Sequence, residues 1–372
     1  MQKNEHERIS HWPAGCSALG WSTTDGKHLW GRNLDYNRLA VETRVCCVPR
    51  GTSYTTCTSA TEHGVARGPR YTAAYAAAGT GLSILPDCPI LYEGVNEKGL
   101  MGGQLYYRQF AHYPDVARPG TDALQPPLAV YHLLAQCSCV EEVVRTLQQD
   151  VTLTAVPLFG AVPPLHWAFS DRSGEMVILE PDESGLSIYR NTIGVMTNSP
   201  SYSWHRLNLL NYAAIRDLDY DTVEVCGEKL EQCFSGSGAQ GLPGDWSSPS
   251  RFIRLALLKQ HAVRGEDEVQ GITNLFHLLG SVAFPLGMVR VTDQGSTSSL
   301  DKTGLPFDYT IYTAAMCAES LRFYWTTHEN QRIQYIDLND LAASGKACQF
   351  DLGRRADYQP CTTPKRPTES VL

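Results

Sequence analysis

The chain has 372 residues, of which 42% are hydrophobic, and this length and composition favour one large domain with a substantial buried core. A formal net charge of −8 argues against nucleic acid and against an anionic membrane surface as partners, because both require a basic binding face. Residues 1–15 lack the apolar stretch of a secretory signal, and no segment has about 18 consecutive apolar residues. We therefore expect a cytoplasmic protein that does not enter a membrane.

The 12 cysteines form no C-x-x-C pair and show no zinc-ribbon spacing, and the chain has no H-E-x-x-H motif. We therefore expect no metal and no cofactor, and free thiols in a reducing compartment, with disulfides as the alternative. Residues 236–241 fit the pattern G-x-G-x-x-G, but Pro243 follows at once and no strand-helix-strand unit surrounds them. A loop is expected there, and no dinucleotide site.

The first predicted element after residue 15 is a β-hairpin. Residues 17–23 are rich in strand formers, residues 24–27 form a turn, and residues 28–30 return as a second strand, which places Arg32 and Asp35 beside Cys16. A thiol with a pKa of about 8.5 needs a base for acyl chemistry. If the bond between Gly15 and Cys16 is cut, the new α-amino group, with a pKa of about 7.7–8.0, can be that base.

In this hairpin Arg32 would favour the thiolate and Asp35 would orient the amine. Two plainer interpretations remain open at this point. Cys16 can be a small buried apolar residue, as most of the 12 cysteines should be. Arg32 and Asp35 can form a surface ion pair of little energetic value.

Apolar periodicity predicts alternating groups of strands and helices in the rest of the chain. Their order is typical of an α+β fold in which two antiparallel sheets lie between two helical layers. Polar residues 52–69 are expected to be an exposed loop, and the polar tail of residues 349–372 is expected to be disordered. The predicted strands are 41–48, 71–77, 90–95, 100–107, 165–169, 176–179, 186–189, 193–196, 309–315, 321–325 and 334–338, and the predicted helices are 128–135, 140–147, 204–214, 249–260 and 266–279.

Four motifs follow one another along the chain: Cys16-Ser17 with residues 31–35, residues 94–100, residues 195–200, and residues 242–245 with residues 250–252. Together they resemble the choloylglycine hydrolase family, which contains bile salt hydrolases and penicillin V acylases. These N-terminal nucleophile hydrolases have a four-layer αββα fold, and the resemblance implies a leader of residues 1–15 that is removed, one domain over residues 16–348, and a homotetramer. Fifteen residues before the cysteine is more than the short leader expected of many relatives.

The resemblance assigns roles to three residues that sequence patterns alone would treat as ordinary. Arg251 reads as a first-turn helix arginine, but by resemblance it stabilises the thiolate. Asn198 reads as a turn residue, but by resemblance it donates to the oxyanion of the tetrahedral intermediate. Tyr106 reads as a packed strand aromatic, but by resemblance it adds an oxyanion contact through its backbone N–H and a ring on the acyl pocket. Penicillin V acylases usually carry Tyr at this position and bile salt hydrolases usually carry Asn.

The expected function is hydrolysis of a linear amide by an N-terminal Cys16, on a small-molecule substrate. Because of Tyr106, penicillin V is placed first, conjugated bile salts second and N-acyl homoserine lactones third. The non-enzymatic alternative is a binder of acyl ligands in which residues 1–15 are never removed. A papain-like protease lacks sequence support for a catalytic His partner. Four apolar or aromatic residues near the motifs or the predicted rim loop 154–164 are candidates for the substrate pocket, although each alone fits a core position equally well: Leu34, Tyr36, Phe159 and Trp167.

Overall fold

Two antiparallel sheets form the centre of the molecule. The structure is a computed structural model and describes residues 15–61, 64–82, 87–158, 160–291 and 305–361. The first sheet has the strand order β16-β1-β2-β20-β21-β22, with β19 paired to β20. Its strands are β1 (Gly15–Ser22), β2 (His28–Tyr36), β16 (Val195–Met196), β19 (Val289–Arg290), β20 (Phe307–Cys317), β21 (Arg322–Thr327) and β22 (Gln334–Asp337).

The second sheet has the order β15-β14-β13-β10-β9-β8-β3-β23. It packs face to face on the first sheet, where β1 contacts β10 and β20 contacts β9. Its strands are β3 (Arg44–Val48), β8 (Ala77–Leu82), β9 (Ile90–Asn96), β10 (Met101–Tyr106), β13 (Leu165–Ser170), β14 (Met176–Asp182), β15 (Gly185–Tyr189) and β23 (Cys348–Phe350).

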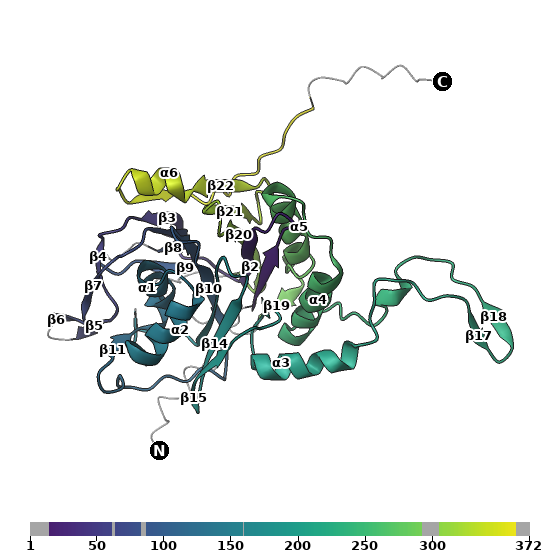
Figure 1. Cartoon of the computed structure of the whole chain (residues 1–372), viewed down its shortest axis with the longest axis horizontal. Helices are drawn as coiled ribbons and strands as arrows, with labels where there is room; N and C mark the ends of the chain where they lie inside the picture. The colour runs from purple at the N-terminus through teal and green to yellow at the C-terminus, as the bar shows by residue number, and fades with distance from the viewer. Residues whose placement is uncertain (1–14, 62–63, 83–86, 159, 292–304, 362–372) are drawn as a thin grey trace.

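Helices cover the outer face of each sheet. Helices α1 (Ala129–Gln136) and α2 (Val140–Gln149) contact the second sheet, and α4 (Ser248–His261) and α5 (Glu268–Gly280) contact the first. The molecule therefore has the four-layer αββα architecture expected from the sequence (Figure 1). Two further helices, α3 (Tyr202–Asn208) and α6 (Leu338–Ala343), lie at its periphery, and the short 3-10 helices are η2 (Pro126–Leu128), η3 (Leu209–Tyr212) and η4 (Ser237–Ala239).

Side-chain alternation along β2 sorts its residues between the two faces of the first sheet. Trp30 reaches Gly103 of the second sheet, and Arg32 donates to Gln104 of that sheet, so the even-numbered side chains point between the sheets. Asn33 donates to the carbonyl of Leu279 in α5, so the odd-numbered positions face the helices. Gly31 lies on this helical face, where a Cβ would come within 3.1 Å of Leu275 and Leu279. The close approach of α5 thus requires glycine at this position.

The sequence-based predictions for residues 71–77 and for the start of the tail are wrong. Residues 71–77 do not form one strand, because the chain turns there and the N–H groups of Ala74 and Tyr75 both donate to the carbonyl of Ala135 at the end of α1. The start of the tail is also ordered, since β23 pairs with β3 and Leu352 is buried. The exposed edge of β3 offers unpaired backbone groups, which a C-terminal strand satisfies.

Among the described residues, four short two-stranded pairs occur outside the two main sheets. The segment predicted as an exposed loop carries three of the strands involved. The pairs are β4 (Ser53–Thr55) with β7 (Arg70–Thr72), β5 (Thr58–Thr61) with β6 (Gly64–Arg67), β11 (Asp122–Leu124) with β12 (Val151–Leu153), and β17 (Val223–Val225) with β18 (Glu228–Leu230).

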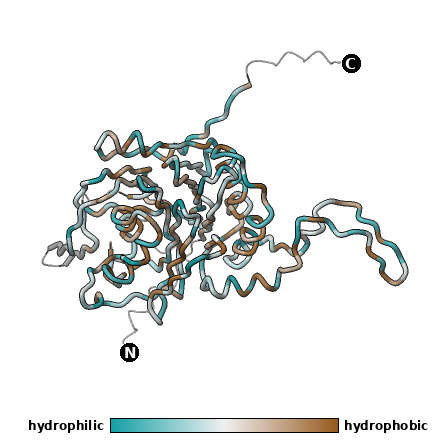
Figure 2. The backbone as a smooth tube through the Cα atoms, viewed as in Figure 1, coloured by the Kyte–Doolittle hydropathy of each residue, from teal (hydrophilic) through white to brown (hydrophobic). Residues whose placement is uncertain are grey.

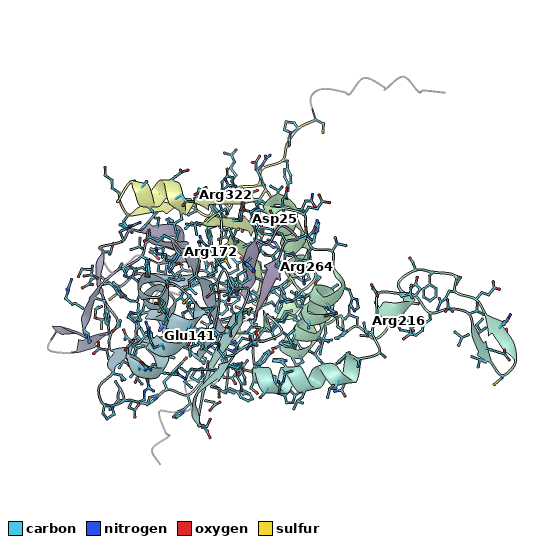
Figure 3. The ribbon with its side chains drawn as sticks, viewed as in Figure 1. Asp25, Glu141, Arg172, Arg216, Arg264 and Arg322 are labelled. Carbon is cyan, nitrogen blue, oxygen red and sulfur yellow. The ribbon has the colours of Figure 1, made fainter. Side chains whose placement is uncertain are left out.

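Residues 213–247, here called the arm, project from the body between α3 and α4 (Figure 1). The arm closes at its base, where the N–H of Arg216 donates to the carbonyl of Gly238 and the Arg216 guanidinium lies 4.2 Å from the ring centroid of Tyr220 (Figure 3). Figure 2 shows hydrophobic segments inside the body, whereas much of the arm is hydrophilic. The sequence analysis did not predict this hairpin.

Within the described residues, no helix combines the length and apolar character needed to cross a membrane. The location of the protein in the cell stays a prediction. The 12 cysteines all lie in the part of the chain that the structure describes, and none of them forms a disulfide.

Candidate active site

The Cys16 thiol lies between the two sheets at the start of β1. Its side chain is 3% exposed, and the Nη2 of Arg32 donates to its Sγ at 2.8 Å. The register places Cys16 opposite Leu34 and Ala18 opposite Arg32, so the thiol and the guanidinium point to the same face. Burial raises the pKa of the thiol, while the charge of Arg32 acts in the opposite direction. The arginine therefore supplies the stabilisation that a thiolate would need in this buried place.

Arg32 is itself held by the second sheet. Its Nη1 donates to Glu93 Oε2 at 3.1 Å and to the carbonyl of Gln104 at 2.9 Å. Glu93 in turn accepts from the hydroxyl of Tyr312 at 2.9 Å. Sequence reasoning missed Glu93, although a carboxylate inside the otherwise apolar strand 90–95 signals a buried partner.

Asn198 connects the backbone of Cys16 to Arg251. Its Oδ1 accepts from the N–H of Cys16 at 2.9 Å and from Arg251 Nη2 at 2.7 Å, and its Nδ2 donates to the carbonyl of Tyr106 at 2.8 Å. The two donors on one side and the carbonyl acceptor on the other define which way the amide points. Asn198, whose local pattern is that of a turn residue and to which the resemblance assigns the oxyanion, is thus hydrogen-bonded directly to Cys16.

Arg251 lies in the first turn of α4 and is 2% exposed. Its Nη1 donates to the carbonyl of Cys16 and, at 2.7 Å, to the hydroxyl of Ser17, and its Nε donates to the carbonyl of Trp246 at 2.8 Å. The guanidinium thus binds the backbone carbonyl of the candidate nucleophile. It acts on the thiol through its positive charge, without a hydrogen bond to the sulfur in the described structure.

Asp35 is fully buried and follows an irregularity in the pairing of β2 with β20. Its Oδ1 accepts from the hydroxyl of Thr310, whereas its Oδ2 has no hydrogen-bond partner among the described residues. Burial raises the pKa of Asp35 to about 6, although the positive charge of Arg251 acts to lower it.

Burial likewise raises the pKa of nearby Asp308 to about 7, and the charge of Asp35 adds to that effect. The sequence analysis did not identify Asp308, because a lone Asp at a strand start has no distinctive pattern.

Gly15, the last residue before the nucleophile, packs against Phe284. A Cβ at Gly15 would lie 2.6 Å from Cζ of that ring, closer than real Cβ contacts. The register of β1 and β2 also pairs Gly15 with Asp35. Only glycine therefore fits between the ring and the strand at this position.

A cavity of about 170 Å³ opens beside the thiol. Leu34, Tyr36 and Tyr106 line it together with Cys16, and the ring centroids of the two tyrosines are 6.0 Å apart. Leu158, Ala161 and Pro163 of the predicted rim loop line it as well. The wall is mainly apolar, which suits a hydrophobic acyl group.

One of the four pocket candidates is not part of this wall, and a second lies outside the residues that the structure describes. Trp167 is a correction: it is 1% exposed and packs in the core between the second sheet and helices α1 and α2, where its ring lies 6.4 Å from that of Tyr113. Alternation along β13 directs it away from the space between the sheets. Phe159 lies outside the described residues. Among the described residues, no three His, Cys, Asp or Glu side chains gather in a way that could hold a metal ion.

Comparison with known proteins identifies the family. The sequence model for "Linear amide C-N hydrolases, choloylglycine hydrolase family" matches residues 16–348. The chain is 31% identical over 326 residues to a bile salt hydrolase/transferase of Clostridium perfringens, which covers 87% of this chain and 92% of that protein. A bile salt hydrolase/transferase of Bifidobacterium longum is 29% identical over 329 residues, or 87% of this chain and 96% of that protein.

Solved structures agree. A crystal structure of a variant of the conjugated bile acid hydrolase from Clostridium perfringens superposes with a TM-score of 0.81 and 28% identity, covering 93% of this chain and 99% of that one. The penicillin V acylase of Agrobacterium tumefaciens has a TM-score of 0.68, 20% identity and coverage of 91% and 92%, and this likeness shows the shared fold alone. The chain belongs to the choloylglycine hydrolase family of linear amide C–N hydrolases.

Proposed function

We propose that Cys16, exposed as the N-terminal residue by loss of residues 1–15, is the nucleophile of an amide hydrolase. The observation that carries the proposal is the convergence on one residue. Arg32 donates to the thiol of Cys16, Asn198 accepts from its backbone nitrogen, and Arg251 donates to its carbonyl. All of this lies beside an apolar cavity.

In the proposed first half-reaction the α-amine of Cys16 takes the proton from Sγ, and the thiolate attacks the carbonyl carbon of the substrate amide. The oxyanion that forms accepts from the Nδ2 of Asn198, which has a second N–H besides the one directed at Tyr106. The C–N bond then breaks, the leaving amine takes the proton, and a thioester remains on Cys16. In the second half-reaction, water loses a proton to the same amine and attacks the thioester carbonyl. The C–S bond then breaks, which releases the carboxylic acid, and the ammonium returns its proton to the sulfur of Cys16.

Tyr106 supports the same oxyanion site. The N–H and C=O of a strand residue point to the same side, and the carbonyl of Tyr106 accepts from Asn198. The N–H of Tyr106 is therefore directed to the side on which Asn198 lies. We assign it as the second oxyanion donor.

The substrate order expected from the sequence changes. Relatives at 29–31% identity are named bile salt hydrolases, whereas the penicillin V acylase is similar at a level that supports only the fold. We therefore place conjugated bile salts, or similar amides between an apolar acid and an amino acid, first. Penicillin V moves from first to second place, which it keeps because of Tyr106 and because the cavity of about 170 Å³ is smaller than typical pockets for drug-sized ligands.

The protein is also proposed to be a homo-oligomer, a tetramer by resemblance, that assembles through the arm. The far hairpin of the arm, β17 with β18, lies away from the body (Figure 1). Isolated two-stranded hairpins are only marginally stable. Its apolar side chains are nevertheless exposed, including Val223 at 48%, Val225 at 51% and Phe234 at 67%. Contact with a second copy would cover them.

Processing is the first test. Intact mass spectrometry of the purified protein should show a chain that begins at Cys16. Cys16→Ala should keep residues 1–15 and lose hydrolysis, because both steps need the thiol, with an unchanged melting temperature as the control for folding. A full-length wild-type chain that binds acyl ligands without turnover would favour the inactive-binder alternative.

Substrate choice is tested by amine release from glycocholate and penicillin V at matched concentrations. We expect a kcat/KM at least about tenfold higher on glycocholate, which corresponds to about 1.4 kcal/mol of transition-state binding. A preference for penicillin V would restore the acylase assignment.

While residues 1–15 are still attached, the buried charge of Asp35 lowers the stability of the folded chain. Its pKa of about 6 exceeds the ordinary value of 3.8, so the folded chain binds this proton more tightly than the unfolded chain does. Its contribution to stability therefore falls as pH rises from about 4 to 6 and stays lower above that window, by about 3 kcal/mol. In the Cys16→Ala chain, Asp35→Asn should raise the melting temperature by several degrees at pH 8 and leave it unchanged at pH 4.

Asp25 is the matched control for Asp35. It is a surface carboxylate (Figure 3) whose pKa is lowered by hydrogen bonds from Lys27 and Thr23. Asp25→Asn should therefore not stabilise the chain at pH 8. Equal effects of the two substitutions would contradict the assigned burial cost.

Assembly is tested by shortening the arm. Because Arg216 N and Gly238 O are 3.0 Å apart, a short glycine linker can replace residues 217–237 without opening the base. We expect the wild-type chain to sediment as a tetramer and the shortened chain as a smaller species. Unchanged sedimentation of the shortened chain would place the interface elsewhere.

A further inference from the structure

Two buried histidines hold the backbone on either side of the bond that joins Thr197 to Asn198. The Nε2 of His166 in β13 lies 2.9 Å from the carbonyl oxygen of Thr197, and the Nε2 of His205 in α3 lies 2.9 Å from that of Asn198. Both rings are almost fully buried. Neither residue belongs to the motifs described above.

The ring of His205 has a defined orientation. It stacks on Phe252 of α4 at a centroid distance of 4.7 Å and an interplanar angle of 14°. Its Nδ1 has no hydrogen-bond partner among the described residues, and burial lowers the pKa of His205 to about 4. At neutral pH the ring therefore carries one proton. Because a carbonyl oxygen can only accept, that proton is on Nε2 and is donated to Asn198.

Ser248 completes the support of Asn198. The N–H of Asn198 donates to Ser248 Oγ at 2.9 Å, and the same hydroxyl lies 3.4 Å from Nε2 of His205. Ser248 begins α4, whose first turn also presents Arg251 to the side chain of Asn198. Both backbone polar groups of Asn198 and both polar atoms of its side chain are thus bonded.

We propose that His205 is a positioning residue for amide hydrolysis: by donating to the backbone carbonyl of Asn198, it fixes the direction of the Asn198 side-chain amide at the oxyanion. The inference rests on the proposed function. His205 does not line the cavity, and no hydrogen bond joins it to Cys16 in the described structure, so it acts through Asn198 alone. Oxyanion donors stabilise a transition state only when they are held in place before charge develops, and a displacement of about 1 Å can cost about 10²-fold in rate.

Two substitutions separate the donor from the bulk of the ring. The amide nitrogen of a Gln side chain can occupy the position of Nε2, whereas that of Asn reaches only the position of Nδ1. His205→Asn should lower kcat by about 10- to 100-fold with KM changed less than about threefold, because KM reports on the cavity. His205→Gln should recover kcat to within about threefold of wild type.

His132 is the matched control. It is another buried histidine with a pKa lowered to about 4 by burial, but it lies in α1, where its Nδ1 is 3.0 Å from the hydroxyl of Tyr54. His132→Asn should lower the melting temperature by an amount similar to that in His205→Asn, and it should leave kcat unchanged. Sedimentation of all variants checks that α3, which leads into the arm, still supports the same assembly.

These measurements distinguish a failure of the role of His205 from a failure of the proposed function. All variants are assayed on the amide that the wild-type enzyme hydrolyses fastest, so a wrong substrate lowers every rate together. Three results would overturn the role of His205: a wild-type kcat in His205→Asn, equal losses in the Asn and Gln variants, or an equal loss of kcat in His132→Asn.

Discussion

The buried guanidinium of Arg32 is the interaction on which the site depends. It lies between the sheets, and it joins the Cys16 thiol of the first sheet to Glu93 and the Gln104 carbonyl of the second. A buried charge without a partner destabilises a protein by several kcal/mol, so the two sheets must supply these acceptors together. The packing of one sheet on the other and the proposed activation of the thiol therefore depend on the same set of contacts.

The remaining groups reach Cys16 from separate elements. Arg251 comes from the first turn of α4, Asn198 from the end of β16, and Thr310, which binds Asp35, from β20. Each fixes a different atom: the carbonyl of Cys16, its nitrogen, or the carboxylate proposed to orient its amine. Burial makes these bonds strong, and it also raises the pKa of Asp35 to about 6. The α-ammonium formed on maturation would give that carboxylate the nearby cation that offsets its burial.

The family and the fold follow from several independent observations. Which acyl group the proposed substrate carries depends instead on the residues that line the cavity. Tyr36 and Tyr106 both line the cavity, and their presence is the argument for a substrate with a small aromatic acyl group. The relatives at 29–31% identity are named bile salt hydrolases, which supports the proposal of a bile acid. The two arguments concern different features, since whole-chain similarity reports on common descent and the tyrosines report on the size of the acyl group.

The sequence by itself determined the layers and the residues of the candidate active site. Period-2 and period-3.6 patterns place the first hairpin, α1, α2, α4 and α5, and the motifs around Cys16, Arg32, Asp35, Asn198 and Arg251 identify residues that the structure brings together. Only the tertiary structure decided the partners: Glu93 beneath Arg32, His205 behind Asn198, Trp167 in the core, and β23 on the edge of β3. Local patterns report which face of an element is buried. They do not report which distant residue meets that face, because this depends on how the strands of each sheet are ordered and how the two sheets are packed.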